Sequence, residues 1–208
     1  MSFSNNTLYQ TERVYLKESK KNRTLTYNGN APSGYTVSNI PSKETFWSGE
    51  NHVISSMVPT AKNGSTQKVF YKWNTKADGT GNWYGPGDTL PKSNTTATTL
   101  YAIWKYRFLY TYDSYCIPQQ NYVRNAAPNG SLTIESLYTS NREDPANDWI
   151  IDYYKSGSTV YEVGKTYKIT ADVTVTPHWK KTEKTYKITY NANLPSNAVG
   201  NVSNIPEA

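Results

Sequence analysis

Several short segments of the chain alternate apolar or aromatic residues with threonine and other polar residues. Successive side chains of a β-strand point to opposite faces, so this alternation predicts strands that are buried on one face only. No long stretch has the periodicity of an amphipathic helix, and only 135–140 and 144–153 could hold a short helical turn. The clearest strand is 173–179, where Val173, Val175, Pro177 and Trp179 share one parity and Thr174, Thr176 and His178 the other. The pattern therefore predicts a mostly β protein with little helix.

The same parity argument assigns an inner face to each predicted strand. Tyr101 and Ile103 are expected to face outward or toward a neighbour. Asp78-Gly79 predicts a hairpin turn, because both residue types tolerate a positive φ. The residues predicted to face the core are Leu25, Tyr27, Val69, Tyr71, Trp73, Leu100, Ala102, Trp104, Tyr110, Tyr112, Trp149, Ile151, Tyr153, Ile188 and Tyr190.

Parts of the sequence recur along the chain. The segment LTYNGN at 25–30 is similar to ITYNAN at 188–193, and each continues through Pro-Ser to VSNIP, at 37–41 and at 202–206. The segment TLYAIW at 99–104 corresponds to TVTPHW at 174–179. Such self-similarity is typical of a chain built from copies of one module.

The recurrences divide the chain into four parts. Residues 25–104 are predicted to form a first repeat and 105–179 a second, divergent repeat. Residues 180–208 are interpreted as a connector and the head of an incomplete further repeat. Residues 1–24 form a leader, and its short segment 6–9 could be the tail strand of a preceding repeat because it is similar to 98–101. We therefore expect small, mostly β modules in a tandem array, each with a thin core that gains from packing against its neighbour.

Composition limits the chemistry that the 208 residues can support. Cys116 is the single cysteine and His52 and His178 are the two histidines, so neither an intramolecular disulfide nor a cysteine-based zinc site is expected. No run of 18 apolar residues is present, so we expect no membrane span. The net charge of +6 lies mostly in the leader and the connector, and we therefore expect no nucleic-acid partner.

The first repeat resembles a known family. The segment FYKWNTKADGTG at 70–81, followed by Tyr84, by GDT at 87–89 and by TLYAIW at 99–104, resembles the Listeria–Bacteroides repeat, also called the internalin B-repeat. The opening YNGN at 27–30 belongs to the same pattern. The second repeat departs from it, since Tyr153 is expected in place of the central tryptophan and His178 in place of an apolar residue. The resemblance implies β-grasp-like modules in tandem on secreted or surface-anchored bacterial proteins, where they serve as stalks or adhesion segments and carry no catalytic motif.

Three features could suggest chemistry, and each has a plainer interpretation. Cys116 could pair with a histidine as a nucleophile, but a free cysteine usually packs as a small hydrophobic residue. The acidic group Glu143, Asp144, Asp148 and Asp152 lacks the spacing of a calcium loop and is interpreted as a solvated surface. The glycine-rich 79–85 lies among turn signals, so we interpret it as turn chemistry. We therefore expect a protein that is not an enzyme and has no catalytic, metal or cofactor site.

Exposed aromatic residues are the remaining candidates for a contact surface. Trp47, Trp83, Tyr84 and Tyr101 lie in or beside predicted turns or on the outward parity. They could pack between adjacent repeats, which is the interpretation we favour, or they could stack on sugars and anchor protein contacts.

These observations lead to three functional hypotheses. The first is a non-catalytic extracellular repeat segment of a bacterial cell-surface or secreted protein, acting as a stalk or adhesion module, with neighbouring repeats or subunits as its partners. The second is a fibre or appendage subunit joined head to tail by strand complementation. The candidate strand-exchange residues are Leu8, Tyr9, Tyr186, Ile188 and Tyr190. The third is a carbohydrate or glycosaminoglycan binder, with host or cell-wall glycans as partners.

Overall fold

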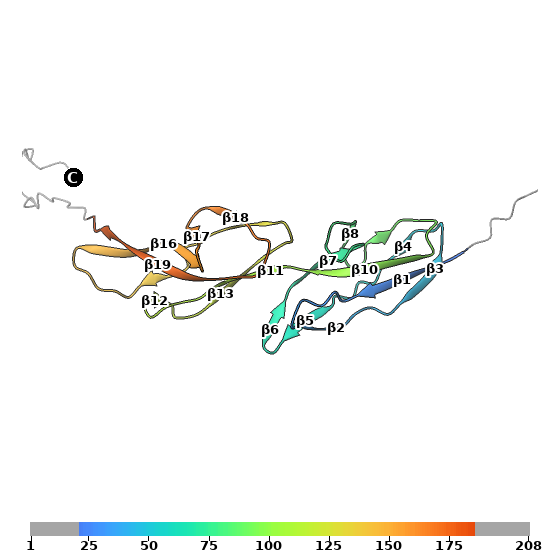
Figure 1. The fold of residues 1–208 in the computed structure, drawn as a ribbon, viewed down its shortest axis with the longest axis horizontal. Coiled ribbons are helices and arrows are strands. Elements are labelled where there is room, and N and C mark those ends of the chain that lie inside the picture. The colour runs from blue at the N-terminus through green and yellow to red at the C-terminus, as the bar shows by residue number, and fades with distance from the viewer. Residues whose placement is uncertain (1–20, 186–208) are drawn as a thin grey trace, which may run out of the picture. The chain divides into compact units, whose positions relative to one another are not determined.

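The computed structural model describes residues 21–185 (Figure 1). It divides into two compact units between Lys105 and Tyr106, here called unit 1 and unit 2. The described residues form strands and turns and no helix, so the expected mostly β fold is confirmed. The short helical turns expected at 135–140 and 144–153 are wrong, because 139–140 and 147–153 are strands and the remaining residues of both segments are not helical. Nowhere in 21–185 is there a helix long and apolar enough to cross a membrane.

The main sheet of unit 1 has the strand order β3-β1-β10-β7-β8. Strands β1 and β10 pair in parallel at its centre, and the other neighbours are antiparallel. Two small sheets, β2-β5-β6 and β4-β9, complete the unit. Its strands are β1 (Asn22–Asn28), β2 (Thr36–Ser38), β3 (Glu44–Trp47), β4 (His52–Val53), β5 (Thr60–Asn63), β6 (Thr66–Lys68), β7 (Phe70–Asn74), β8 (Trp83–Tyr84), β9 (Thr89–Leu90) and β10 (Ala97–Trp104).

Unit 2 has a main sheet of order β13-β11-β19-β16-β17 and the small sheets β12-β15 and β14-β18. Strands β11 and β19 are parallel, and the other neighbours in the main sheet are antiparallel. Its strands are β11 (Tyr106–Tyr110), β12 (Cys116–Ile117), β13 (Tyr122–Ala126), β14 (Ser131–Thr133), β15 (Thr139–Ser140), β16 (Asn147–Ser156), β17 (Thr159–Glu162), β18 (Thr166–Lys168) and β19 (Val173–Glu183).

The two units follow the same path, strand for strand, apart from β6, which has no counterpart in unit 2. The register also agrees, since Tyr27 pairs with Leu100 in unit 1 as Tyr110 pairs with Val175 in unit 2. A parallel pair cannot be joined by a short hairpin, so in each unit the chain between the first and last strands forms the remaining strands and both small sheets.

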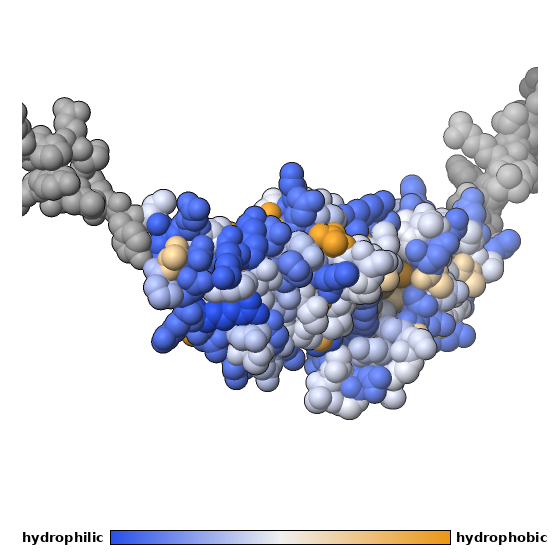
Figure 2. Space-filling model, turned by 60° about the vertical axis from the view of Figure 1, so that its left-hand side comes forward, coloured by the Kyte–Doolittle hydropathy of each residue, from blue (hydrophilic) through white to orange (hydrophobic). Residues whose placement is uncertain are grey.

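Each unit has its own core on one face of its main sheet. The alternation correctly predicted which side chains of β1, β10 and β19 face the core, since Leu25, Leu100 and Ala102 are fully buried and Trp104 and Trp179 nearly so. The side chains that fill the core of unit 1 are Leu25, Tyr27, Ile54, Ala61, Trp73, Leu90, Leu100, Ala102 and Trp104. The core of unit 2 is built from Phe108, Tyr110, Cys116, Ala126, Ile134, Tyr138, Ile151, Tyr154, Ile169, Val175 and Trp179. Surface apolar residues are scattered among hydrophilic ones on the face seen in Figure 2.

A β-bulge lies at the same place in both units and changes the predicted parity. In unit 2, Ile151 pairs with Trp179 and Tyr153 with His178, so Asp152 is the extra residue. Tyr153 therefore lies on the outer face, and Tyr154 is the fully buried residue. The predicted inward position of Tyr153 is wrong.

The same irregularity affects unit 1. Trp104 pairs with Phe70 and Ile103 with Lys72, so Tyr71 is the extra residue. Tyr71 is half-buried and Val69 is 40% exposed, which corrects their predicted inward positions. Tyr112 is also 44% exposed, because β11 ends at Tyr110 and the alternation does not continue past it.

Candidate functional site

The four aromatic residues singled out in the sequence lie on two faces of unit 1. Cross-strand pairs share a face, so Trp47 (opposite Asn22) and Trp83 (opposite Asn74) lie on the outer face of the main sheet, as does Tyr101. Trp47 and Trp83 are 44% and 37% exposed. They sit on opposite edge strands, with β1, β10 and β7 between them, and therefore do not form one cluster.

Tyr84 lies on the inner face instead. It pairs with Trp73 and packs against the core of unit 1, half-buried. Trp83, its neighbour in β8, makes an edge-on contact with Tyr71, with ring centroids 5.4 Å apart. The candidate strand-exchange residues Leu8, Tyr9, Tyr186, Ile188 and Tyr190 lie outside the described residues.

Cys116 is not paired with a histidine. The thiol is buried and lies 3.3 Å from Oδ1 of Asp113, and burial raises its pKa to about 11. His52 contacts Glu44 and stacks on Phe46, whereas His178 stacks on Tyr153. A thiol with a raised pKa stays protonated near neutrality and is a poor nucleophile.

Three of the four residues of the acidic group of unit 2, Asp144, Asp148 and Asp152, lie close to lysines of β19 and to the lysine that follows it. Lys180 lies 2.7 Å from Asp152, and Lys181 lies 3.2 Å from Asp144. The pKa of Asp144 is lowered to about 2, chiefly because its carboxylate accepts hydrogen bonds from the backbone N–H of Ala146 and from Asn147. In the part of the chain that the structure describes, no group of three or more His, Cys, Asp or Glu residues could hold a metal ion.

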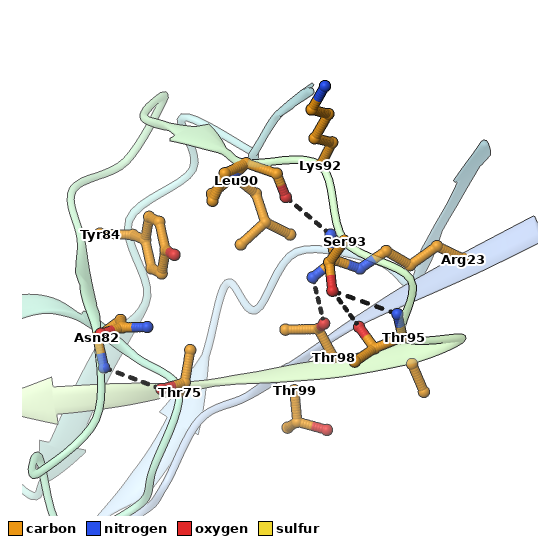
Figure 3. Close-up of a pocket in the computed structure, with 12 residues that line it drawn as sticks. Arg23, Thr75, Asn82, Tyr84, Leu90, Lys92, Ser93, Thr95, Thr98 and Thr99 are labelled. Atoms are coloured by element: carbon orange, nitrogen blue, oxygen red, sulfur yellow. Dashed lines mark hydrogen bonds between the residues drawn. The ribbon is translucent and has the colours of Figure 1, made fainter. Parts of the chain in front are cut away.

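A hollow of about 520 Å³ opens beside the start of β10 in unit 1 (Figure 3). It exists because β7 pairs with β10 only from Tyr101 to Trp104, so Ala97 to Thr99 have a strand partner on one side only. Figure 3 shows Tyr84 and Asn82 on one side of the hollow and Arg23 with Thr98 on the other. The hollow is lined by Arg23, Thr75, Asn82, Tyr84, Leu90, Pro91, Lys92, Ser93, Thr95, Ala97, Thr98 and Thr99.

Arg23 is the buried one of the two charged residues that line this hollow, the other being Lys92. Its parity in β1 is that of Leu25 and Tyr27, so its side chain enters the inner face and is only 4% exposed. Nη1 donates to the carbonyl of Pro91 at 2.9 Å and Nη2 to Oγ1 of Thr98 at 2.8 Å. Nε has no hydrogen-bond partner within residues 21–185, and burial lowers the pKa of the guanidinium, which nevertheless stays charged.

The sequence analysis does not single out Arg23, because this residue lies in the predicted leader 1–24 that carries much of the positive charge. The alternation of Arg23, Leu25 and Tyr27 was the available signal, since it places the arginine on the buried parity. The hollow itself depends on where β7 separates from β10, and no local pattern encodes that point.

Comparisons with protein-family models, with curated proteins and with solved structures find no match for this chain.

Proposed function

We propose that the chain is a non-catalytic segment of a bacterial cell-surface or secreted protein, in which copies of one β module act as a stalk or adhesion region. The observation that carries the proposal is the agreement of the two units in strand order, in register and in the position of the bulge. Chains built from like modules in series are typical of extended scaffolds that space or present a binding surface.

Two local details support the interpretation as copies. The indole N–H of Trp104 donates to the carbonyl of Asn30, and the indole N–H of Trp179 donates to the carboxylate of Asp113, which occupies the corresponding position after the first strand. Gly87 and Gly164 occupy corresponding turns with φ of 79° and 81°, a backbone conformation that favours glycine. The resemblance of residues 25–104 to the internalin B-repeat supports a bacterial surface setting for this module.

Surface labelling tests the proposal directly. Antibodies raised against the purified chain should stain intact cells of the bacterium that encodes it, and brief protease treatment of those cells should remove the stain. Staining that requires permeabilised cells would overturn the surface assignment. A hydrolase or transferase activity of the purified chain that a single substitution abolishes would overturn the non-catalytic assignment.

A further inference from the structure

We propose that the hollow beside β10 in unit 1 binds an acidic sugar, with Arg23 receiving its carboxylate or sulfate group. This inference deepens the proposed function, because it gives the adhesion module a ligand class and a place to hold it. Four properties of the site carry it.

The first property is a buried positive charge that has no anionic partner among the described residues, although the guanidinium also lies 5.6 Å from the ring centre of Phe46. Arg23 is 4% exposed, yet among the described residues its hydrogen bonds reach only neutral oxygens, those of Pro91 and Thr98. Burying a cation without an anionic partner is costly, and an oxyanion in the hollow would offset that cost. A guanidinium has five N–H donors in a planar fork that matches carboxylate and sulfate oxygens.

The second property is the absence of competing negative charge in the wall. None of the residues lining the hollow is aspartate or glutamate, and Lys92 adds a second cation at its rim (Figure 3). Lining by one sign of charge raises the local concentration of an oppositely charged ligand.

The third property is a set of hydroxyl groups with hydrogen-bonding capacity left. Oγ1 of Thr98 accepts from Arg23, and Oγ1 of Thr75 accepts from the backbone N–H of Asn82 at 2.9 Å. Each of these threonines therefore keeps its own O–H for a further acceptor. Sugar hydroxyl groups are both donors and acceptors, and they suit such a lining.

The fourth property is shape. A volume of about 520 Å³ lies within the range of small-molecule sites and holds a sugar unit. The ring of Tyr84 stands across the hollow from the guanidinium in Figure 3 and offers a flat apolar surface. Sugar rings present C–H faces that pack on such surfaces while their hydroxyl groups bind polar neighbours.

Unit 2 provides an internal comparison. The matching registers of the parallel pairs place Tyr106 at the position of Arg23 and Val173 at that of Thr98. Tyr106 has no guanidinium group, and Val173 has no hydroxyl group that could accept a hydrogen bond. Of the two parallel strand pairs that the structure describes, only that of unit 1 therefore carries this site.

The test is an amide NMR titration of the isotope-labelled full chain with glucuronate, with galactose 6-sulfate and with uncharged glucose. We expect the acidic sugars to shift the amide signals of Thr95, Thr98 and Thr99 with a dissociation constant on the order of 1 mM, and glucose to bind about tenfold more weakly. The acidic sugar that binds with the lower dissociation constant shows whether the site prefers a carboxylate or a sulfate group. Equal shifts with glucose, or no shifts with any sugar at concentrations of about 50 mM, would overturn the proposal.

Variants of the full chain assign the contact. Arg23→Gln should weaken binding of the better acidic sugar by at least about tenfold, the loss expected for a charged hydrogen bond. Lys62→Gln removes one positive charge from the exposed surface of β5 and should leave the affinity unchanged. If Arg23→Gln does not fold, Thr98→Val keeps the side-chain shape and should still weaken binding by about threefold. Unchanged affinity of the folded variants for the acidic sugar would contradict the role given to Arg23 and Thr98. It would not affect surface labelling of intact cells, so failure of the sugar site can be distinguished from failure of the proposed function.

Discussion

The indole N–H of Trp179 donates a 2.9 Å hydrogen bond to Oδ2 of Asp113, joining the inner face of β19 to the loop that follows β11. The other carboxylate oxygen, Oδ1, accepts from the backbone N–H of Tyr115 at 2.9 Å and lies 3.3 Å from the thiol of Cys116. The carboxylate of Asp113 thus accepts the hydrogen bond of a nearly buried indole N–H and also holds the turn that leads into β12.

Asp113→Ala should therefore lower the free energy of unfolding of unit 2 by ~2 kcal/mol, because it leaves the indole N–H and a turn N–H without their acceptor. Hydrogen exchange measured by mass spectrometry on the full chain checks this, since it reports on the two units separately. Asp148→Ala is the control, because Asp148 is exposed and lies 3.9 Å from Lys184; it should change stability by no more than about 0.5 kcal/mol. Equal effects of the two substitutions would contradict the role given to Asp113.

The bulge in β16 gives a second prediction, which concerns two adjacent tyrosines. Tyr154 is fully buried, packs edge-on against Tyr110 at 4.9 Å, and accepts a hydrogen bond from the backbone N–H of Leu137. Tyr153 lies on the opposite face, where it stacks on His178. Tyr154→Ala should cost ~3–5 kcal/mol through the cavity that it leaves, and Tyr153→Ala should cost less than about 1 kcal/mol.

Urea unfolding of the two variants, monitored by hydrogen exchange of unit 2 amides, compares the losses in the free energy of unfolding. The predicted order depends on Asp152 being the extra residue of the strand. A larger loss for Tyr153→Ala than for Tyr154→Ala would mean that β16 pairs in the unbroken register that simple alternation predicts.

These two tyrosines also show how far the sequence predicts the fold. Alternation alone placed Leu25, Tyr27, Trp104 and Trp179 on the buried faces, because each lies in a regular stretch of its strand. It failed at Tyr153, since one extra residue in a strand moves every later side chain to the other face. The sequence carries no mark of the bulge, whose position follows from pairing with a strand more than 20 residues away.

The candidate site was less predictable than the fold. Trp83 and Tyr84 are neighbours in the sequence, yet β8 sends one to the outer face and the other toward the hollow. Arg23 is distant in sequence from the residues that it contacts, being separated from Thr98 by 75 positions. Contacts of this range depend on the parallel pairing of β1 with β10, which a pattern within one strand cannot specify.

Buried tyrosines and the buried thiol make alkaline pH the next prediction. Burial raises the pKa of Tyr138 to about 12 and that of Cys116 to about 11, and it also raises the pKa of Tyr27 and Tyr154. In the unfolded chain these groups lose their protons near their ordinary values of 9.0 for the thiol and 10.0 for tyrosine. Deprotonation at high pH therefore favours the unfolded state.

Stability should be fully present below about pH 9 and should fall as the pH rises through 11 and 12. Denaturant titrations at a series of pH values measure the fall, and the absorbance of tyrosinate reports when the phenols ionise. For the buried tyrosines that signal should appear together with unfolding. Ionisation of all tyrosines near pH 10, while the fold is retained, would contradict their burial. As a control, Tyr71→Phe, at a half-buried residue, should leave the dependence of unfolding free energy on pH unchanged.

The last prediction concerns Asn74, a fully buried polar residue at the end of β7. Its Oδ1 accepts from the backbone N–H of Lys76 and of Gly81, both at 2.9 Å, and its Nδ2 donates to the carbonyls of Gly79 and Gly81. The side-chain amide of Asn74 thus supplies hydrogen-bond partners to backbone N–H and C=O groups of the loop 75–82. A Cβ at Gly81 would lie 2.7 Å from Oδ1 of Asn74, so the close approach of the loop requires glycine there.

Asn74→Ala should lower the free energy of unfolding of unit 1 by ~2–3 kcal/mol, because it leaves several loop groups without partners in a buried setting. It should also speed amide exchange in 75–82 more than elsewhere in the unit. Asn63→Ala, in an exposed position at the end of β5, should change stability by no more than about 0.5 kcal/mol. Because Thr75 and Asn82 of the same loop line the hollow, Asn74→Ala should weaken binding of an acidic sugar as well. A variant that loses no protection in 75–82 would show that the loop holds its shape without this side chain.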